Sequence, residues 1–329
     1  MKAAVYTRHG PPEVVRVTEV PKPVPKDNEV LVRIHAATVC AADWRMRKAE
    51  PSLIRLMNGL LRPAKARILG IEFSGIVESV GSAVTAVSAG AEVFGTPGFQ
   101  FGAHAEYICL PEDGVLAPKP ANMPLEEAAA VLFGGFTALH FLRKANIQAG
   151  QNVLIYGASG SVGVFAVQLA KYFGARVTGV CSASNLELVR SLGAAEVLDY
   201  ARQDFSSAGP VYDMVFDAAG YSGFSRSLRA LKRGGYYVTV GGSGRILALL
   251  AGILRSAWTN ATGVAKVFGG VAAGNREDQL FLKGLIDAGQ LRTVIDRRYP
   301  LERIAEAHHY VEAGHKRGHV IILMDQPAT

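Results

Sequence analysis

A glycine-rich segment near the middle of the chain has the spacing of a phosphate-binding loop. Residues 157–163 read GASGSVG, between an apolar run and a stretch with helical spacing. Glycines let the backbone approach a pyrophosphate and let the following helix pack closely on its strand. The free N–H groups at the helix start present positive partial charge to an anion. Although Ala158 replaces the first glycine of the strict pattern, the context predicts a dinucleotide site. Its expected contacts are Gly157, Ser159, Gly160, Ser161, Val162 and Gly163.

The end of the next apolar run discriminates between the two nicotinamide cofactors. A carboxylate there would bind the ribose 2′-OH of NAD(H) and repel a 2′-phosphate. Residues 180–185 contain no carboxylate and offer Ser182, Ser184 and Asn185 instead, which can donate hydrogen bonds to a phosphate. Ser184 is also placed to cap the helix that begins next, so capping alone is the alternative. We expect NADPH to be preferred over NADH.

The elements around this loop alternate between strand and helix. Short apolar runs predict strands at 152–156, 176–180, 196–198, 214–217, 236–240 and 264–268. Helical spacing predicts helices at 124–133, 136–146, 161–173, 185–192, 222–231 and 275–288. Apolar strands alternating with helices indicate a parallel sheet covered on both faces. Ala219, Gly241 and Gly242 follow strands of this sheet, at the carboxyl ends where such sheets bind ligands.

The rest of the chain indicates a second, β-rich domain. Strands are expected at 14–20, 30–36, 73–80, 92–95 and 103–109, and they favour a partly open barrel. The tail predicts a strand at 293–298, a helix at 301–313 and a strand at 319–323. This tail is too small to fold alone, so it should pack on the first domain. We expect domains at 1–122, completed by 291–329, and at 123–290.

Composition excludes several classes of protein. A chain of 329 residues suggests about two domains. Its 49% hydrophobic and 19% charged residues exclude intrinsic disorder. No run of 18 apolar residues predicts a membrane span, and the polar N-terminus does not resemble a signal peptide. Three separated cysteines favour a reducing, cytoplasmic location. The net charge of +7 is spread along the chain, which favours a solvated surface over nucleic-acid binding; attraction of a phosphorylated small ligand is the alternative.

Taken together, these motifs resemble the medium-chain dehydrogenase/reductase superfamily, in its zinc-free quinone oxidoreductase-like branch. The resemblance covers nearly the whole chain. The matching stretches are 1–6, 69–77, 157–163, 166–171, 193–194 and 299–301. The resemblance implies an α/β fold: a GroES-like β-rich catalytic domain, a doubly wound Rossmann domain and a cleft between them.

The resemblance also identifies the positions that hold a catalytic zinc in metal-dependent relatives. Such a zinc needs three protein ligands. Cys40 keeps the first, but Ile71 replaces the histidine and Phe133 replaces the second cysteine. Isoleucine and phenylalanine cannot ligate a metal, so no zinc is expected. Cys40 is then a small buried thiol, or alternatively a residue facing the substrate.

Without a metal, the acceptor should be one that takes a hydride readily. In quinones and α,β-unsaturated carbonyl compounds, conjugation spreads the developing charge onto an oxygen that hydrogen bonds can stabilise. The expected activity is therefore NADPH-dependent reduction of a quinone or an enone. One alternative is reduction of an enoyl thioester held by Arg62, Lys65 and Arg67. The other is a non-catalytic NADPH-binding redox sensor.

The remaining site residues follow from the resemblance. Tyr200 corresponds to a tyrosine beside the adenosine phosphate, or is a surface tyrosine. Thr137 corresponds to a threonine near the nicotinamide, or is an ordinary helix hydroxyl. Asp43, Trp44 and Arg47 lie on the segment that borders the substrate cleft in relatives, although Asp43 and Arg47 also fit a helix ion pair.

No residue stands out as a proton donor, and water is an alternative donor. The four C-terminal histidines are expected at the surface: His308, His309, His315 and His319. A homodimer is expected, as is common for such folds. Two apolar stretches, 53–61 and 246–254, fit core packing, a dimer contact, a lid over the acceptor or attachment to a membrane surface.

Overall fold

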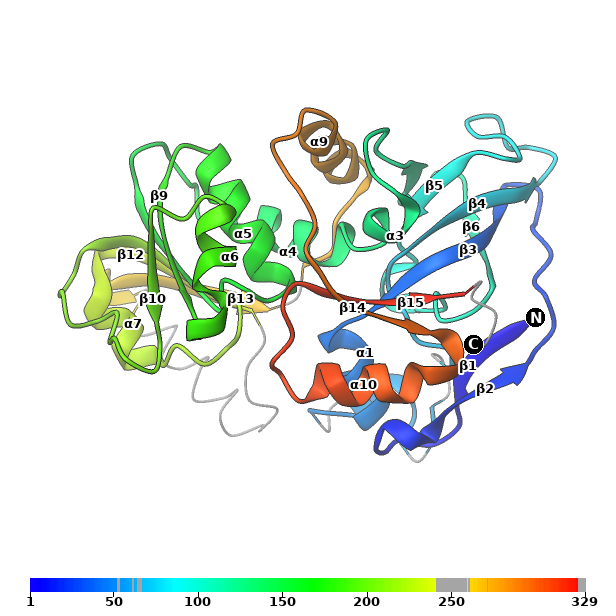
Figure 1. Cartoon of the computed structure of the whole chain (residues 1–329), viewed down its shortest axis with the longest axis horizontal. Helices are drawn as coiled ribbons and strands as arrows, with labels where there is room; N and C mark the ends of the chain where they lie inside the picture. Colours follow the sequence, from blue (N-terminus) through cyan, green and yellow to red (C-terminus); the bar gives the residue numbers. More distant parts are fainter. Residues whose placement is uncertain are drawn as a thin grey trace. The chain divides into compact units, whose positions relative to one another are not determined.

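The computed structural model describes residues 1–51, 54–60, 62–63, 67–240, 259, 261–270 and 272–324. It divides into two compact units (Figure 1). Unit 1 comprises Met1–Phe133, Gly274–Gly289 and Thr293–Thr329. Unit 2 comprises Gly134–Ala273 and Gln290–Arg292. The apolar stretch 246–254, Lys65, Gly241 and Gly242 lie outside the described residues.

Unit 2 is built on a six-stranded parallel sheet of order β10-β9-β8-β11-β12-β13. In chain order the strands are β8 (Asn152–Tyr156), β9 (Arg176–Cys181), β10 (Glu196–Asp199), β11 (Tyr212–Asp217), β12 (Leu231–Val240) and β13 (Ala265–Gly270). The order reverses beside β8, which is the Rossmann arrangement with its switch point between β8 and β11. The predicted doubly wound fold is confirmed.

Helices connect these parallel strands. They are α5 (Ser161–Tyr172), the short 3-10 turn η3 (Ala183–Asn185), α6 (Leu186–Ser191) and α7 (Phe224–Ala230). Every residue of α5 from Ser161 to Ala170 is buried. A helix buried on all sides needs apolar residues throughout, and seven of these ten are Val, Phe, Ala or Leu. The loop before α5 is therefore held between a central strand and a core helix.

Unit 1 contains a seven-stranded sheet and a separate hairpin. The hairpin pairs β1 (Lys2–Tyr6) with β2 (Val15–Glu19), which follows the 3-10 turn η1 (Pro12–Val14). The larger sheet has the order β14-β15-β3-β4-β5-β7, and β6 also pairs with β3. Its strands are β3 (Glu29–Val39), β4 (Phe73–Val80), β5 (Glu92–Gly95), β6 (Tyr107–Pro111), β7 (Leu116–Pro118), β14 (Ile295–Pro300) and β15 (His319–Leu323).

Short helices and turns link the strands of unit 1. They are α1 (Ala41–Lys48), α2 (Ile54–Asn58), the 3-10 turn η2 (Gly98–Gln100) and α3 (Leu125–Ala128). The helix α4 (Leu132–Lys144) begins in unit 1 and continues into unit 2. The β-rich character predicted for this part of the chain is confirmed.

The C-terminal tail groups with unit 1. Strand β15 pairs antiparallel with β3, so red and blue ribbons lie side by side in Figure 1. The tail also contains the 3-10 turn η4 (Leu301–Arg303) and the helix α10 (Ile304–Glu312), which packs on α1. The backbone of the tail is thus hydrogen-bonded to β3. No local sequence pattern encodes this long-range pairing.

Helix α9 (Arg276–Asp287) groups with unit 1, whereas the expected boundary placed residues 275–288 with the dinucleotide-binding half. Its contacts explain the grouping. Gln279 Nε2 donates to Phe94 O at 2.9 Å, and the carboxylate of Asp287 accepts from Ala121 N at 3.0 Å. The helix begins at Asn275, whose side chain accepts from Asp278 N as an N-cap.

Two local expectations are wrong. In place of the helix predicted over 124–133, the four residues of α3 are followed by a turn, and α4 begins at Leu132. His308 and His319, expected at the surface, are 0% and 1% exposed. His308 lies on the same buried face of α10 as Ile304, Ala307 and Val311, so helix register rather than polarity decides its position.

One stretch of the described residues, Leu125–Lys144, is long and apolar enough to cross a membrane by length and composition. It spans α3 and α4, and its most apolar 18 residues have a mean hydropathy of 1.3 and are 72% buried inside the protein. Burial of this kind is typical of a core helix.

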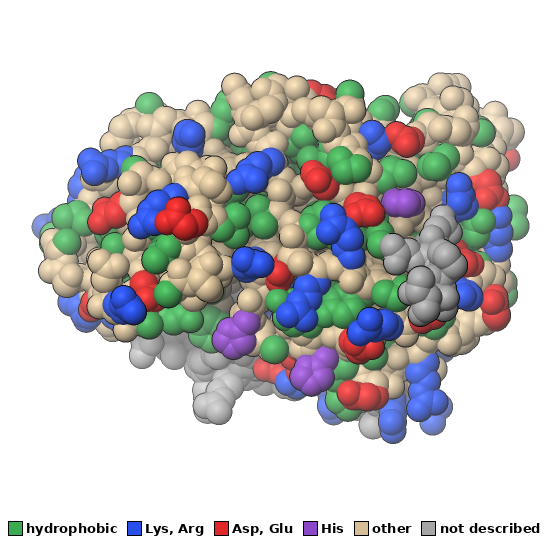
Figure 2. Space-filling model, viewed as in Figure 1, with side chains coloured by type: hydrophobic (Ala, Val, Ile, Leu, Met, Phe, Trp, Pro, Cys, Tyr) green, Lys and Arg blue, Asp and Glu red, His purple; other side chains and the backbone are tan. Residues whose placement is uncertain are grey.

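On the face drawn in Figure 2, Lys and Arg side chains are scattered among Asp and Glu side chains.

Candidate functional site

The glycine loop lies between β8 and α5, as the sequence predicted. Gly157 has φ +77°, which a residue with a side chain rarely adopts, and a Cβ there would approach the Cβ of Ala219 to 2.8 Å. A Cβ at Gly163 would lie 2.1 Å from Gly157 O, so the first turn of α5 packs directly on the loop. Gly160 is the N-cap residue of α5. The predicted contacts from Gly157 to Gly163 are therefore brought together at one helix N-terminus.

A small polar network joins this loop to the end of β9. Asn185 Nδ2 donates to Ser159 Oγ at 3.1 Å and to Ser182 Oγ at 3.0 Å. Ser182 Oγ also lies 3.2 Å from Ser184 Oγ. Asn185 is 6% exposed, and its Oδ1 has no hydrogen-bond partner among the described residues. Three predicted cofactor residues thus form one connected cluster with Ser159, and it contains no carboxylate.

Ser184 does not take the capping position suggested as its alternative role. The N-cap residue of α6 is Asn185, and no side chain makes a cap hydrogen bond there. Tyr200 follows β10, and its backbone N–H donates to Cys181 O at 3.2 Å. Its side chain is 49% exposed. Tyr200 therefore lies beside the end of β9, and its contact with an adenosine phosphate stays a prediction.

Asp217, at the end of β11, organises the turn that follows this strand and was missed by the sequence analysis. It is 1% exposed, and its carboxylate accepts from the N–H groups of Ala219 (3.2 Å), Gly220 (2.7 Å) and Ser222 (2.8 Å). These bonds fix Ala219 against Gly157. The available signal was an aspartate directly before Ala-Ala-Gly, because such a side chain bonds to backbone N–H groups just ahead of it.

Thr137 lies in α4 and is 4% exposed. Its predicted position near a nicotinamide stays a prediction, as does the contact of Ala219 with the cofactor. The other two predicted contacts, Gly241 and Gly242, fall outside the described residues.

In unit 1, the predicted substrate-side residues lie on α1. Asp43 is fully buried and accepts from Cys40 N at 2.7 Å and from Gly70 N at 2.8 Å. Arg47 is fully buried, donates to Gly10 O at 2.9 Å and pairs with Glu312 on α10. The alternative Asp43–Arg47 ion pair is therefore replaced by separate partners that hold α1 in place.

Trp44 differs from its two buried neighbours because it is only partly buried. It packs against the apolar core of unit 1, and Arg45 and Lys48 lie over its ring at 5.3 and 5.9 Å. That Asp43, Trp44 and Arg47 border the substrate stays a prediction.

Cys40, Ile71 and Phe133 share one apolar cluster. Cys40 and Ile71 are among its buried residues, and Phe133 packs against it. Burial raises the pKa of the Cys40 thiol well above its usual value, and the nearby Asp43 and Glu72 act in the same direction. Within the described ranges, no group of three His, Cys, Asp or Glu side chains could hold a metal ion.

Glu72 is a buried carboxyl group that the sequence analysis did not single out. It is 1% exposed and accepts from Thr38 Oγ1 at 2.6 Å and from Phe133 N at 2.8 Å. Desolvation raises its pKa to about 7, although these hydrogen bonds act in the opposite direction. Desolvation likewise lowers the pKa of Lys316 to about 8, while the neighbouring Cys40, Asp296 and Glu72 act in the opposite direction. Desolvation therefore moves the pKa of both groups toward neutral pH.

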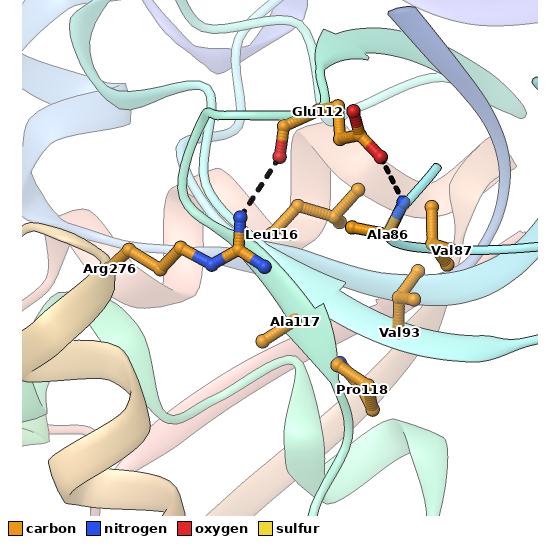
Figure 3. A pocket seen from close by; sticks show the side chains of 8 residues that line it. All are labelled: Ala86, Val87, Val93, Glu112, Leu116, Ala117, Pro118 and Arg276. Carbon is orange, nitrogen blue, oxygen red and sulfur yellow. Dashed lines mark hydrogen bonds between the residues drawn. The ribbon is translucent and has the colours of Figure 1, made fainter. Parts of the chain in front are cut away.

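A separate small depression lies at the edge of unit 1 (Figure 3). Its lining is mostly apolar, and Arg276 and Glu112 are its two charged residues. Arg276 donates to the backbone oxygen of Glu112 at 3.2 Å, while the Glu112 carboxylate accepts from Thr85 N at 2.6 Å and from Ala86 N. None of the predicted site residues lines this depression, so it is not the candidate site.

Comparison with known proteins agrees with this architecture. Residues 26–121 match the family model "Alcohol dehydrogenase GroES-like domain", and residues 192–322 match "Zinc-binding dehydrogenase". A 2-methylene-furan-3-one reductase from Solanum lycopersicum is 30% identical, over 98% of this chain and 79% of the relative. An NADPH-dependent alkenal/one oxidoreductase from Arabidopsis thaliana is 29% identical over the same shares. A quinone oxidoreductase from Sus scrofa is 31% identical, over 97% and 95%.

Two solved structures extend the likeness to three dimensions. The quinone oxidoreductase from Coxiella burnetii has a TM-score of 0.86 and 32% identity, covering 99% of both chains. The Escherichia coli quinone oxidoreductase complexed with NADPH has a TM-score of 0.81 and 26% identity, covering 98% of this chain and all of the other. A β-rich GroES-like part combined with a Rossmann sheet defines a class of oxidoreductases, and the chain belongs to the medium-chain dehydrogenase/reductase superfamily. Within that superfamily it falls in the quinone oxidoreductase-like branch.

Proposed function

We propose that this protein is an NADPH-dependent, zinc-independent oxidoreductase that transfers a hydride to quinones or α,β-unsaturated carbonyl compounds. The observation that carries the proposal is the glycine loop joined to Ser182 and Asn185 at the end of β9. The free backbone N–H groups at the start of α5, which follows this loop, can bind a pyrophosphate. Two relatives whose names or structures include NADPH support the choice of cofactor.

The expected preference for NADPH over NADH rests on the absence of a negative charge at the end of β9. Ser182 and Ser184 offer hydroxyl donors, and no carboxylate in this cluster would repel a 2′-phosphate. Asn185 Oδ1 is a buried acceptor without a partner in the described part of the chain, and a ribose hydroxyl could donate to it. These groups bind and orient the adenosine end, while a bound nicotinamide supplies the hydride.

The choice of acceptor follows from the apolar cluster of Cys40, Ile71 and Phe133. These side chains offer one thiol and no imidazole or second thiolate, so they lack the donor set of a catalytic zinc. An acceptor that spreads its own developing charge by conjugation needs only hydrogen-bond donors. Relatives named for quinones, an alkenal/one and a methylene-furanone fit that class.

The test is NADPH oxidation, followed by absorbance, against quinones, enones and enoyl thioesters, with NADH run in parallel. We expect turnover with quinones or enones and a clear preference for NADPH. Faster turnover of crotonyl-CoA than of simple enones would favour the enoyl-thioester alternative. Tight NADPH binding without turnover of any acceptor would favour a redox sensor. One stoichiometric zinc per chain in elemental analysis would contradict zinc independence.

We also propose that the chain forms a homodimer through β13. This strand is at the edge of the unit 2 sheet, and its outer side has no paired strand among the described residues. Exposed strand edges readily pair with a second copy. Light scattering should give twice the monomer mass. A monomeric unaltered protein would contradict the proposal.

A further inference from the structure

The first turn of α4 is held by a carboxyl group from elsewhere in unit 1. A helix N-terminus leaves backbone N–H groups without intrahelical partners. At α4, Glu72 accepts from one of them, Phe133 N, at 2.8 Å. Thr38, at the end of β3, donates to the other Glu72 oxygen at 2.6 Å and so fixes the carboxyl group. The start of α4 is thereby tied to the sheet of unit 1.

The next residue ties the same turn to the helix that follows the glycine loop. A Cβ at Gly134 would lie 2.3 Å from Ser161 O and 2.8 Å from Phe165 Cδ2. Only glycine therefore fits where the backbone of α4 meets the first turn of α5. Ser161 is the first residue of α5, directly after the loop residue Gly160. A small displacement of α4 at Phe133 would therefore be passed to the helix start that faces the pyrophosphate.

We infer that Glu72 is a positioning residue for the dinucleotide loop: by fixing Phe133 N, it sets the position of Gly134 against Ser161. The inference rests on the proposed function, because the glycine loop must be the cofactor site for the effect on binding to appear. The hydrogen bonds of Glu72 to Thr38 and Phe133 do not reach the glycine loop itself. Its effect is exerted through two consecutive residues of α4, Phe133 and Gly134.

The experiment combines amide hydrogen exchange on the cofactor-free protein with fluorescence titration of NADPH. Glu72→Ala removes the acceptor for Phe133 N, and we expect faster exchange at residues 133–137 and also at 159–163. The dissociation constant for NADPH should rise about tenfold, the scale expected for a buried donor left without its partner. Glu72→Gln keeps an oxygen for Phe133 N and should stay within about threefold of the unaltered protein.

Two further variants separate positioning from general stability. Gly134→Ala pushes α4 away from Ser161 without touching Glu72, and it should raise the dissociation constant in the same direction. Gly284→Ala places the same methyl group in α9, where no atom lies within 4 Å, and should leave the dissociation constant unchanged. In steady state, KM for NADPH should rise in Glu72→Ala and Gly134→Ala more than kcat falls.

The outcomes are decisive in either direction. Faster exchange confined to residues 133–137, or a lowered melting temperature with unchanged NADPH affinity, would overturn the inference and leave Glu72 a stabilising residue only. If Glu72→Ala does not fold, Glu72→Asp, which shortens the side chain by one methylene, is judged by the same criteria. The exchange at 159–163 is read without cofactor, so failure of the proposed function and failure of this inference are distinguishable.

Discussion

Buried polar side chains, rather than exposed ones, organise the candidate site. Asp217 gathers the N–H groups of the turn after β11, Asn185 joins two loops, and Glu72 holds the start of α4. A buried polar group is costly unless it is hydrogen-bonded, so each of these side chains fixes its neighbours as firmly as it is fixed itself. The geometry of the loop therefore depends on buried polar side chains around it as well as on its own glycines.

The absence of a carboxylate at the end of β9 leads to a prediction about cofactor preference. Ser182→Asp places a carboxylate beside Ser184 and Asn185. We expect the dissociation constant for NADPH to rise at least tenfold, because a carboxylate repels a 2′-phosphate, and that for NADH to change much less. Fluorescence titration with both cofactors checks this. Ser88→Asp adds the same charge at an exposed site in unit 1, and an equal effect of both variants would contradict the prediction.

Because His308 is buried, we expect the folded protein to lose stability in acid. His308 is fully buried edge-to-face against His104, with ring centroids 5.8 Å apart. Burial lowers its pKa well below 6.5, and the charges of His104 and Arg47 act in the same direction. Burial also lowers the pKa of His319 to about 3. At these two histidines the unfolded chain therefore binds protons that the folded chain excludes, so their destabilising effect is absent above about pH 6.5 and grows as the pH falls below it.

The expected loss is about 1.4 kcal/mol per pH unit for each buried histidine. Urea unfolding at pH 7.5, 6.5 and 5.5 measures the slope. His308→Leu should flatten it by about one histidine's share, whereas His315→Leu, at an exposed position, should not. Parallel pH dependences for the two variants would show that His308 is not the group responsible.

Among the helices, α5 and α9 illustrate two opposite uses of glycine. Gly163 in α5 is required by close packing on the loop, whereas Gly284 in α9 is exposed with open space around it. In helix α4, the first turn is held by the side chain of Glu72, and its glycine, Gly134, packs closely against α5. Nearby residues in the sequence determine where each helix lies along the chain. Whether a glycine is required in it depends on which distant element packs against it.

Substitution of these two glycines should therefore have opposite effects. Gly284→Ala should stabilise the protein by about 0.5–1 kcal/mol, because alanine has the higher helix propensity and meets no obstacle. Gly163→Ala should destabilise the protein and reduce NADPH affinity more than tenfold, because its methyl group would overlap Gly157 O. Chemical unfolding and NADPH titration of both variants provide the check. Equal effects would contradict the contrast in packing.

The two units have separate sheets and separate apolar clusters. The main cluster of unit 1 includes strands from both ends of the chain, while the cluster around Leu154, Val215 and Tyr237 lies within unit 2. Chains with several cores need not unfold in one step. A ligand that binds one unit raises the stability of that unit through mass action.

Calorimetry should accordingly resolve two transitions. NADPH at 100 times its dissociation constant should stabilise the transition of unit 2 by about 2.7 kcal/mol and move the other transition less. Ser182→Asp serves as the control, since it should weaken this shift without altering the cofactor-free scan. A single transition that moves as a whole with NADPH would contradict independent unfolding.

The sequence by itself determined the glycine loop, the order of strands and helices in unit 2 and the absence of a carboxylate at 180–185. These features are local: apolar period, glycine spacing and residue type act over a few neighbours. Strands β4, β5, β8 and β15 were predicted at their observed bounds for this reason.

The tertiary structure alone decided which distant residues meet. The pairing of β15 with β3, the grouping of α9 with unit 1 and the burial of His308 follow from contacts across hundreds of residues. The hydrogen bond from Phe133 N to Glu72 likewise joins residues 61 apart in the chain. Such contacts depend on the global arrangement of sheets and helices, which no local spacing encodes, and they are the ones that position the candidate site.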